Sequence, residues 1–461
     1  MFELADAAPA LLAARIQFAT TISFHIVLAA FSLGLAQWLL VLEAMWLWRG
    51  NAHAMNLYRR WLKVFALTVA VGTASGLVME YQFGLNWAPL ANQAGAIIGP
   101  LMFYEVLVAF FLEAGFLGVM LFGLQRVGPR LHFFATCAVA AGSLASAFWI
   151  LAANSWMQTP AGYSIDAAGH FVAEDWWAIV FNPSFPYRLA HMIVAALLGT
   201  ASLVAGAGGW QLLHAPDNPR ARLQYSMALW VLAVAMPLQI VVGDLHGEHS
   251  LAVQPQKVAA IEGTWNRPPP GAGEALRLFA LPDMAARRND YEWAIPRVAS
   301  LYLTHDLHGT IAGLNQFPEQ DNPPMLPVFL AFRVMVGLGV LMLLQGLAGL
   351  WLRRRRRLAT TRWLQRVSVT MAPAGFLAML SGWVVTEVGR QPFTVYGLLR
   401  TADSLSPVSA AQVSTATAAI LVFYTLVFAV GLWLLLRLLR QPPDAQEAGP
   451  QPGLPGARDH G

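Results

Sequence analysis

The chain has 461 residues, of which 57% are hydrophobic and only 12% are charged. A soluble globular protein carries about 25% charged residues, so this composition excludes an ordinary soluble enzyme and indicates a polytopic membrane protein. The net charge of +4 does not indicate nucleic-acid binding, because the arginines lie mainly in short connections between apolar runs.

Nine apolar runs are long enough to cross a bilayer as helices, which predicts an all-α membrane protein. The first run follows Glu3 and Asp6 instead of basic residues and is too long for a signal-peptide core, so we expect it to be retained. In chain order the expected spans are 15–45, 61–82, 97–124, 131–153, 187–213, 224–244, 326–351, 366–387 and 415–438.

The connections between these spans alternate in charge. Those after the second and fourth spans are uncharged or acidic, whereas those after the odd-numbered spans are basic. Basic connections stay on the cytoplasmic side, so the N-terminus is predicted outside and the C-terminus inside. The basic residues are Arg49, Arg59, Arg60, Lys63, Arg126, Arg130, Arg220, Arg222, Arg353 to Arg357 and Arg362.

This pattern divides the chain into four regions. Residues 1–244 hold six spans, and 326–440 hold three. Between them, 245–325 form a long mixed-charge connection on the outer side, and a connection of that length is usually functional. The proline-rich tail, 441–461, is predicted to be disordered and cytoplasmic.

Two glutamates lie within the apolar stretch "LMFYEVLVAFFLEAGF" (101–116). Glu105 and Glu113 are eight residues apart, which on an α-helix is about 12 Å of rise and roughly 80° of rotation, so both lean toward one side. A charged group at the centre of a span costs about 3 kcal/mol, so each needs a reason. Similar candidates on other spans are His25, His191, Arg333 and Glu387, with Met335 as a soft neighbour; Glu43, Glu80 and Asp244 lie near span ends and are weaker candidates.

The simplest explanation for any one of these residues is pairing with a polar group on another helix. Their depth argues for more, because with the predicted orientation His25, Glu105, His191, Met335 and Glu387 all fall in the outer half of the membrane. Imidazole, thioether and carboxylate groups on separate helices suit haem iron, and arginines balance haem propionates. The lone Cys137 excludes a Cys-x-x-Cys-His haem attachment and a cysteine-ligated cluster. Glu113 lies deeper, where a buried carboxylate can relay protons.

Seven motifs carry a family resemblance. They are "RIQFATTISFH" (15–25), "GLVMEYQFGLNW" (76–87), "FFLE" (110–113), "GSLASAFWILAANSWMQTP" (142–160), "QPQKVAAIEG" (254–263), "FRVM" (332–335) and "GWVVTEVGRQPF" (382–393). Together they resemble subunit I of the cytochrome bd-type quinol oxidases, and they extend from the first span to the eighth. The resemblance implies three haems and the reduction of oxygen to water by quinol.

The resemblance also implies roles for single residues. His191 and Met335 match the ligands of a low-spin haem b, and Glu387 matches the ligand of a high-spin haem b. His25 matches the ligand of the oxygen-reactive haem, normally haem d, with Glu105 on its other side. Lys257 and Glu262 match the quinol-site pair, Arg333 and Arg390 match residues beside haem propionates, and Glu113 and Ser146 match positions of a proton path.

The chain departs from the familiar family pattern at three places. The connection after the sixth span, 245–325, is short for the family because it lacks the long C-terminal insertion of the enterobacterial form. The stretch "GDLHGEHS" (243–250) resembles the cyanide-insensitive subgroup, and "GRQPF" replaces "GRQPW" at Phe393. Some members of that subgroup carry haem b in place of haem d, so the oxygen site is expected to hold either haem d or a third haem b.

As a whole, the resemblance implies an electrogenic enzyme of the bacterial cytoplasmic membrane. Quinol, expected to be ubiquinol, is oxidised on the outer side, and the protons for water come from the inside without pumping. A large second subunit and small single-span subunits are the expected partners. Two other classes stay open from the residues alone: a dihaem b subunit that only passes electrons on, and a secondary transporter with intramembrane carboxylates.

Overall fold

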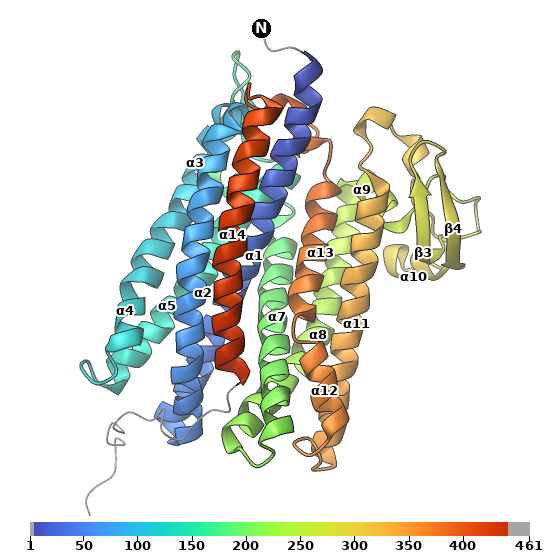
Figure 1. Cartoon of the computed structure of the whole chain (residues 1–461). Coiled ribbons are helices and arrows are strands. Elements are labelled where there is room, and N and C mark those ends of the chain that lie inside the picture. Colours follow the sequence, from blue (N-terminus) through green and yellow to red (C-terminus); the bar gives the residue numbers. More distant parts are fainter. Residues whose placement is uncertain (1–3, 441–461) are drawn as a thin grey trace, which may run out of the picture.

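We describe the protein from a computed structural model, which places residues 4–440. Within this range nine helices are long and apolar enough to cross a membrane, which confirms the predicted all-α class and number of spans. Figure 1 shows them as one elongated bundle. The helices that form the spans are α1 (Leu4–Arg49), α2 (Ala52–Leu85), α3 (Ala88–Val108) with α4 (Gly115–Phe122), α5 (Pro129–Gln158), α6 (Trp176–Val180) with α7 (Phe185–His214), α8 (Pro219–Val253), α11 (Met325–Arg354), α12 (Arg362–Thr370) with α13 (Ala374–Val388), and α14 (Ala410–Arg440).

Most of these helices extend past the limits set by the apolar runs. The clearest case is α8, which was predicted to end at residue 244 and continues to Val253. Its last turns carry the polar sequence "GDLHGEHS", which ends an apolar run without ending a helix. Hydropathy marks where a helix leaves the hydrocarbon, whereas the helix itself ends where its hydrogen bonds do.

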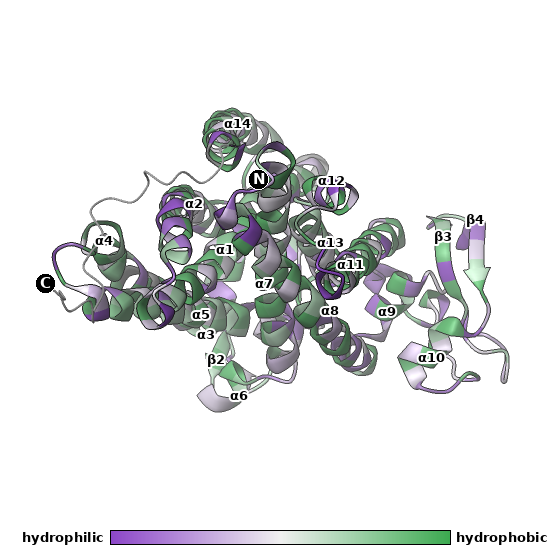
Figure 2. Cartoon of the chain, turned by 90° about the horizontal axis from the view of Figure 1, so that it is seen from below, coloured by the Kyte–Doolittle hydropathy of each residue, from purple (hydrophilic) through white to green (hydrophobic). Residues whose placement is uncertain are grey.

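Small residues let the central helices approach closely. On α1, a Cβ at Gly34 would lie 2.7 Å from the carbonyl oxygen of Ala196 on α7, so only glycine fits there. Such contacts between small residues are how membrane helices pack when lipid offers no hydrophobic driving force. Figure 2 shows hydrophobic residues predominating over the helices, as expected for a surface that faces lipid.

The predicted outer connection, 245–325, is a folded unit. It contains α9 (Pro255–Glu262), the antiparallel hairpin of β3 (Leu276–Asp283) and β4 (Arg288–Ile295), and α10 (Val298–Thr304). Buried apolar residues of α9 form one core cluster with residues of α11 and α13, so this unit is fixed to the membrane helices. It projects beside α11 near the end of the bundle that carries the N-terminus (Figure 1).

Two smaller hairpins complete the described structure. They are β1 (Tyr163–Ile165) with β2 (Phe171–Ala173), and β5 (Phe393–Val395) with β6 (Leu399–Arg400). The tail 441–461, predicted to be disordered, lies outside the described residues.

Candidate functional site

His191 and Met335 both adjoin glycines of neighbouring helices. A Cβ at Gly243 on α8 would lie 3.5 Å from Cε1 of His191, and a Cβ at Gly382 on α13 would lie 2.9 Å from the sulfur of Met335. His191 Nδ1 is buried and has no hydrogen-bond partner among the described residues. An orphaned imidazole nitrogen and a thioether in glycine-lined surroundings fit side chains that a bound group engages, because a buried polar atom otherwise finds a partner.

His25 on α1 is oriented by one hydrogen bond. Its Nδ1 lies 3.1 Å from Oγ of Ser75 on α2, and Ser75 in turn donates to the carbonyl of Gly72 at 2.7 Å. Because the serine proton is already donated, Nδ1–H must be the donor, which leaves Nε2 with its lone pair available for iron. Metal-binding histidines are typically fixed in this way through their other nitrogen.

Glu105 and Glu113 both face α5, although they are not on one continuous α-helix. Ser146 donates to Glu105 Oε1 at 2.7 Å, and a Cβ at Gly142 would lie 3.2 Å from Cγ of Glu113. Between the two glutamates the third span passes into a π-helical segment, Ala109–Ala114. A π-turn accommodates one extra residue, which removes about 100° of rotation and changes the predicted offset of roughly 80° to about −20°. The π-turn therefore aligns Glu113 more closely with Glu105 than a regular helix would.

Glu387 on α13 lies in a cage of hydrogen-bond donors. Its Oε1 accepts from Asn154 at 3.2 Å and from Gln158 at 3.1 Å, and its Oε2 accepts from Arg390 at 2.5 Å. Arg188 on α7 is 3.8 Å from Oε1. The carboxylate thus has polar partners of its own, and it retains lone pairs for a further ligand because an ionised carboxylate offers about four acceptor sites.

The same region holds more buried cations than carboxylates. Arg188, Arg390 and Lys257 are at most 7% exposed and share the single carboxylate of Glu387. The Nε atoms of both arginines, and Nη1 of Arg390, find no hydrogen-bond acceptor within the described structure. Buried guanidinium groups with unmatched N–H donors call for anions, so this cluster fits the carboxylates of a bound haem.

Lys257 takes part in this cluster from α9. Its ammonium group donates to Gln158 Oε1 at 2.7 Å. Burial, and next the charge of Arg188, hold the pKa of Lys257 well below its ordinary value.

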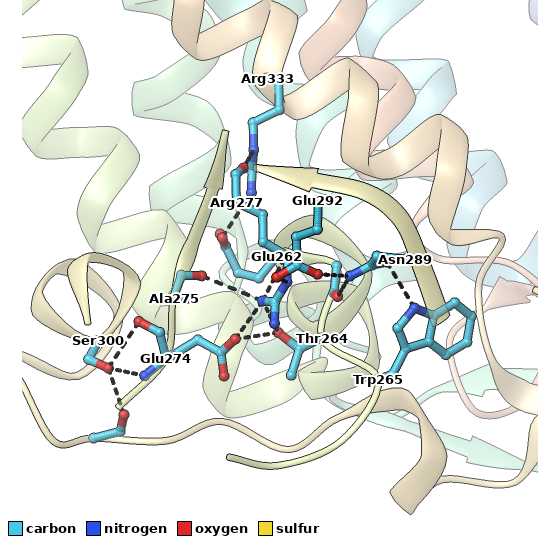
Figure 3. A network of polar contacts seen from close by, with 12 residues as sticks. Glu262, Thr264, Trp265, Glu274, Ala275, Arg277, Asn289, Glu292, Ser300 and Arg333 are labelled. Carbon is cyan, nitrogen blue, oxygen red and sulfur yellow. Dashed lines mark hydrogen bonds and ion pairs between the residues drawn. The ribbon is translucent and has the colours of Figure 1, made fainter. Parts of the chain in front are cut away.

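Glu262, at the other end of α9, belongs to a separate network shown in Figure 3. Its Oε2 accepts from Arg333 Nη2 at 3.1 Å, while Arg333 Nε donates to the carbonyl of Arg277 at 2.6 Å. Burial raises the pKa of Glu262, and the charge of Arg333 partly opposes that rise. The structure therefore places Lys257 and Glu262 at two different polar clusters and does not bring them together as an ion pair.

The structure adds residues that sequence reasoning missed. Arg188, Asn154 and Gln158 surround Glu387, and the ring of His246 lies 5.5 Å from that of His191. A signal for Arg188 existed, because it stands three residues before His191 at the start of a span.

Comparison with known proteins identifies the family of the chain. The model of the family "Cytochrome bd terminal oxidase subunit I" matches residues 13–443. Cytochrome bd ubiquinol oxidase subunit 1 of Bacillus subtilis is 33% identical over 442 residues, which is 94% of each chain. Cytochrome bd-II ubiquinol oxidase subunit 1 of Escherichia coli is 29% identical and covers 94% of this chain and 97% of its own. Among solved structures, bd oxidase from Geobacillus thermodenitrificans superposes with a TM-score of 0.87 at 28% identity, covering 94% of this chain and 99% of that one.

A family model over nearly the whole chain, supported by relatives and by a solved structure of the same fold, rules out the transporter and electron-transfer-only alternatives. The chain belongs to the cytochrome bd terminal oxidase subunit I family and is a haem-bearing, membrane-spanning subunit of a terminal quinol oxidase.

Proposed function

We propose that this chain oxidises quinol on the outer side of a bacterial cytoplasmic membrane and reduces oxygen with protons drawn from the inner side. The observation that carries the proposal is the order in which Glu105 and Glu113 face residues of α5. Ser146, which holds Glu105, stands four residues nearer the Gln158 end of α5 than Gly142, which adjoins Glu113. At 1.5 Å per residue this sets Glu113 about 6 Å closer to the arginine-rich end of the bundle, which the positive-inside rule assigns to the cytoplasm.

Bound haems supply the electron transfer and the oxygen chemistry of this class. We assign His191 and Met335 to a low-spin haem b, and His25 with Glu105 to the oxygen-reactive haem, which is haem d or a third haem b. Glu387 is assigned to a high-spin haem b. Arg333 and Arg390, joined by Arg188, are assigned to the propionates, because their buried N–H donors require anionic partners.

Quinol recognition is assigned to α9. Glu262 is a buried carboxylate, and burial raises its pKa, which makes it a stronger base toward a quinol hydroxyl. Lys257, at the other end of α9, is assigned to a second polar contact with the quinol head group. Protons released here leave on the outer side, because α9 lies near the end of the bundle that carries the N-terminus (Figure 1).

Proton delivery is assigned to Glu113. Glu113 lies nearer the arginine-rich end than Glu105 along α5. It can therefore transfer protons from that end toward Glu105 and the oxygen site. Charge separation then follows from drawing protons from one side and releasing them on the other. The second large subunit belongs to the enzyme, and we propose ubiquinol as the electron donor and small single-span chains as further partners.

The experiment is a spectrum combined with turnover. Purified enzyme should show a reduced-minus-oxidised haem spectrum that carbon monoxide changes, and it should consume oxygen with quinol. Glu113→Gln should slow oxygen consumption by about 10²-fold or more, as loss of a positioned proton donor does, while leaving the haem spectrum intact. Turnover at the wild-type rate in this variant would refute the assignment of Glu113.

A further inference from the structure

A second buried polar cluster lies near the arginine-rich end of the bundle, away from the residues assigned above. It joins Glu43 on α1, Tyr58 on α2, and His132 and Thr136 on α5, and none of the four is more than 1% exposed. Glu43 Oε1 is 2.5 Å from His132 Nδ1, and Glu43 Oε2 accepts from Thr136 at 2.5 Å. Tyr58 lies 3.0 Å from the Thr136 hydroxyl. Burying a charge costs free energy unless it is paired and hydrogen-bonded, so a fully buried carboxylate–imidazole pair needs a purpose.

The hydrogen bonds fix where the protons lie. Thr136 donates to Glu43, so Tyr58 must donate to Thr136. His132 Nε2 is 3.0 Å from the carbonyl oxygen of Met120, which can only accept, so Nε2 carries a proton. One proton therefore remains between His132 Nδ1 and Glu43 Oε1. The pair is neutral overall whichever of the two atoms holds that proton.

Two members of the cluster, His132 and Thr136, lie on α5, the helix whose Gly142 adjoins Glu113. Along α5, Thr136 and Gly142 are six residues apart, or about 9 Å of rise. The interval is not purely apolar, since Gln37 on α1 donates to the carbonyl of Ala140 at 2.8 Å and approaches Ser143 Oγ at 3.5 Å. Gln37 and Ser143 thus supply polar side chains on α1 and α5 in the region between the Glu43–His132 pair and Glu113.

His132 also has the form of a proton carrier. One of its nitrogens faces Glu43, and the other faces the C-terminal turn of α4, which leads into the connection between α4 and α5 at the arginine-rich end. Because Nε2 keeps its proton against the Met120 carbonyl, the nitrogen that gains and loses a proton is Nδ1, which faces Glu43. Histidine is suited to such an exchange near neutral pH.

We propose that the Glu43–His132 pair is the inner proton donor of the path to Glu113. This inference rests on the proposed function, which draws protons from the inner side. The proton between Nδ1 and Oε1 leaves from Glu43 toward Gln37, Ser143 and Glu113. The pair is then left with a neutral imidazole, protonated at Nε2, and a carboxylate. It regains neutrality when Nδ1 or Glu43 Oε1 binds one proton from the inner side.

A purely structural latch between α1, α2 and α5 is the competing explanation, and isosteric substitution separates the two. Glu43→Gln keeps the size and the hydrogen-bonding capacity of the side chain but cannot release a proton. Glu43→Asp keeps the ionisable group and shortens the side chain. A latch should tolerate the amide better than the shorter acid, whereas a proton donor requires the acid.

The test uses the complete haem-loaded enzyme and measures proton uptake with a pH-indicator dye after the fully reduced enzyme is mixed with oxygen. We expect Glu43→Gln to slow uptake and steady-state turnover by about tenfold or more, with unchanged haem absorption and thermal midpoint, and Glu43→Asp to recover most of the rate. The control is Gln224→Met on α8, which removes the acceptor of the Trp61 indole N–H, 3.0 Å away, and the hydrogen bond from Gln224 to Gln211. It should leave uptake unchanged. If Glu43→Gln does not assemble, His132→Gln serves instead, with the same expected slowing.

Wild-type uptake in Glu43→Gln, or equal slowing in Glu43→Gln and Glu43→Asp, would overturn the inference. Glu113→Gln, measured alongside, separates this failure from failure of the proposed function. If Glu113→Gln is slow while Glu43→Gln is fast, protons reach Glu113 by another route and the proposed function stands. If both are fast, the assignment of Glu113 fails as well.

Discussion

Substituting alanine for Gly142 perturbs Glu113 without altering its chemistry. The added methyl group would lie 2.8 Å from Cβ of Leu112 and 3.2 Å from Cγ of Glu113. Carbon atoms in contact prefer about 3.5–4.0 Å, so the π-helical segment must move away from α5 by about 1 Å. Overpacking of this kind costs about 1–3 kcal/mol of stability. A shift of 1 Å in a reacting group can cost about 10²-fold in rate, so we expect turnover to fall by between about ten- and a hundredfold.

The assay is quinol-driven oxygen consumption by purified enzyme, with the haem spectrum recorded on the same sample. The spectrum should be unchanged, because the atoms nearest to a Cβ at Gly142 belong to Leu112 and Glu113, neither of which is assigned as an iron ligand. Gly118→Ala is the matched control, since it adds the same methyl group later in the same span where no atom lies within 4 Å. Wild-type turnover in Gly142→Ala, or equal loss in both variants, would refute the reasoning that the π-turn and the glycine aim Glu113 at α5.

Three further predictions concern the assigned ligands and the quinol site. Gly382→Ala places a Cβ 2.9 Å from the sulfur of Met335, so it should displace that ligand and lower the midpoint potential of the low-spin haem in a redox titration; an unchanged potential would argue against Met335 as a ligand. Ser75→Ala removes the acceptor that orients His25 and should alter the spectrum of the oxygen-reactive haem but not that of the low-spin haem. Because burial raises the pKa of Glu262, quinol oxidation should rise with pH through a midpoint above the ordinary carboxyl value of about 4.3, as the carboxylate becomes able to accept a proton. In Glu262→Gln that limb of the pH–rate profile should disappear, and its persistence would exclude Glu262 as the proton acceptor.

The spans could be predicted from sequence because the bilayer imposes one solution. Backbone groups in hydrocarbon must be satisfied within the segment, so every long apolar run had to be a helix, and all nine are. Outside the hydrocarbon this constraint is absent. The continuation of α8 to Val253 and the folded unit around β3 and β4 depend on contacts between distant residues, which hydropathy does not report.

The candidate site could be predicted in part. The cost of burying a polar group drew attention to His25, Glu105 and Glu387, but not to their partners. Arg188 was missed because it stands where a span begins. The π-helical segment that contains Glu113 was missed because "AFFLEA" has no proline or glycine to mark a break, and its effect depends on a glycine one helix away.

We propose that protons for water are drawn from the membrane side that faces the arginine-rich end of the bundle, while quinol protons leave on the opposite side. The most direct measurement uses the enzyme reconstituted in one orientation in sealed vesicles, with pH dyes in both compartments during quinol oxidation. We expect the compartment facing the arginine-rich end to become alkaline while the other becomes acidic, and Glu113→Gln to slow both changes. Alkalinisation of the compartment that faces α9 would contradict this proposal.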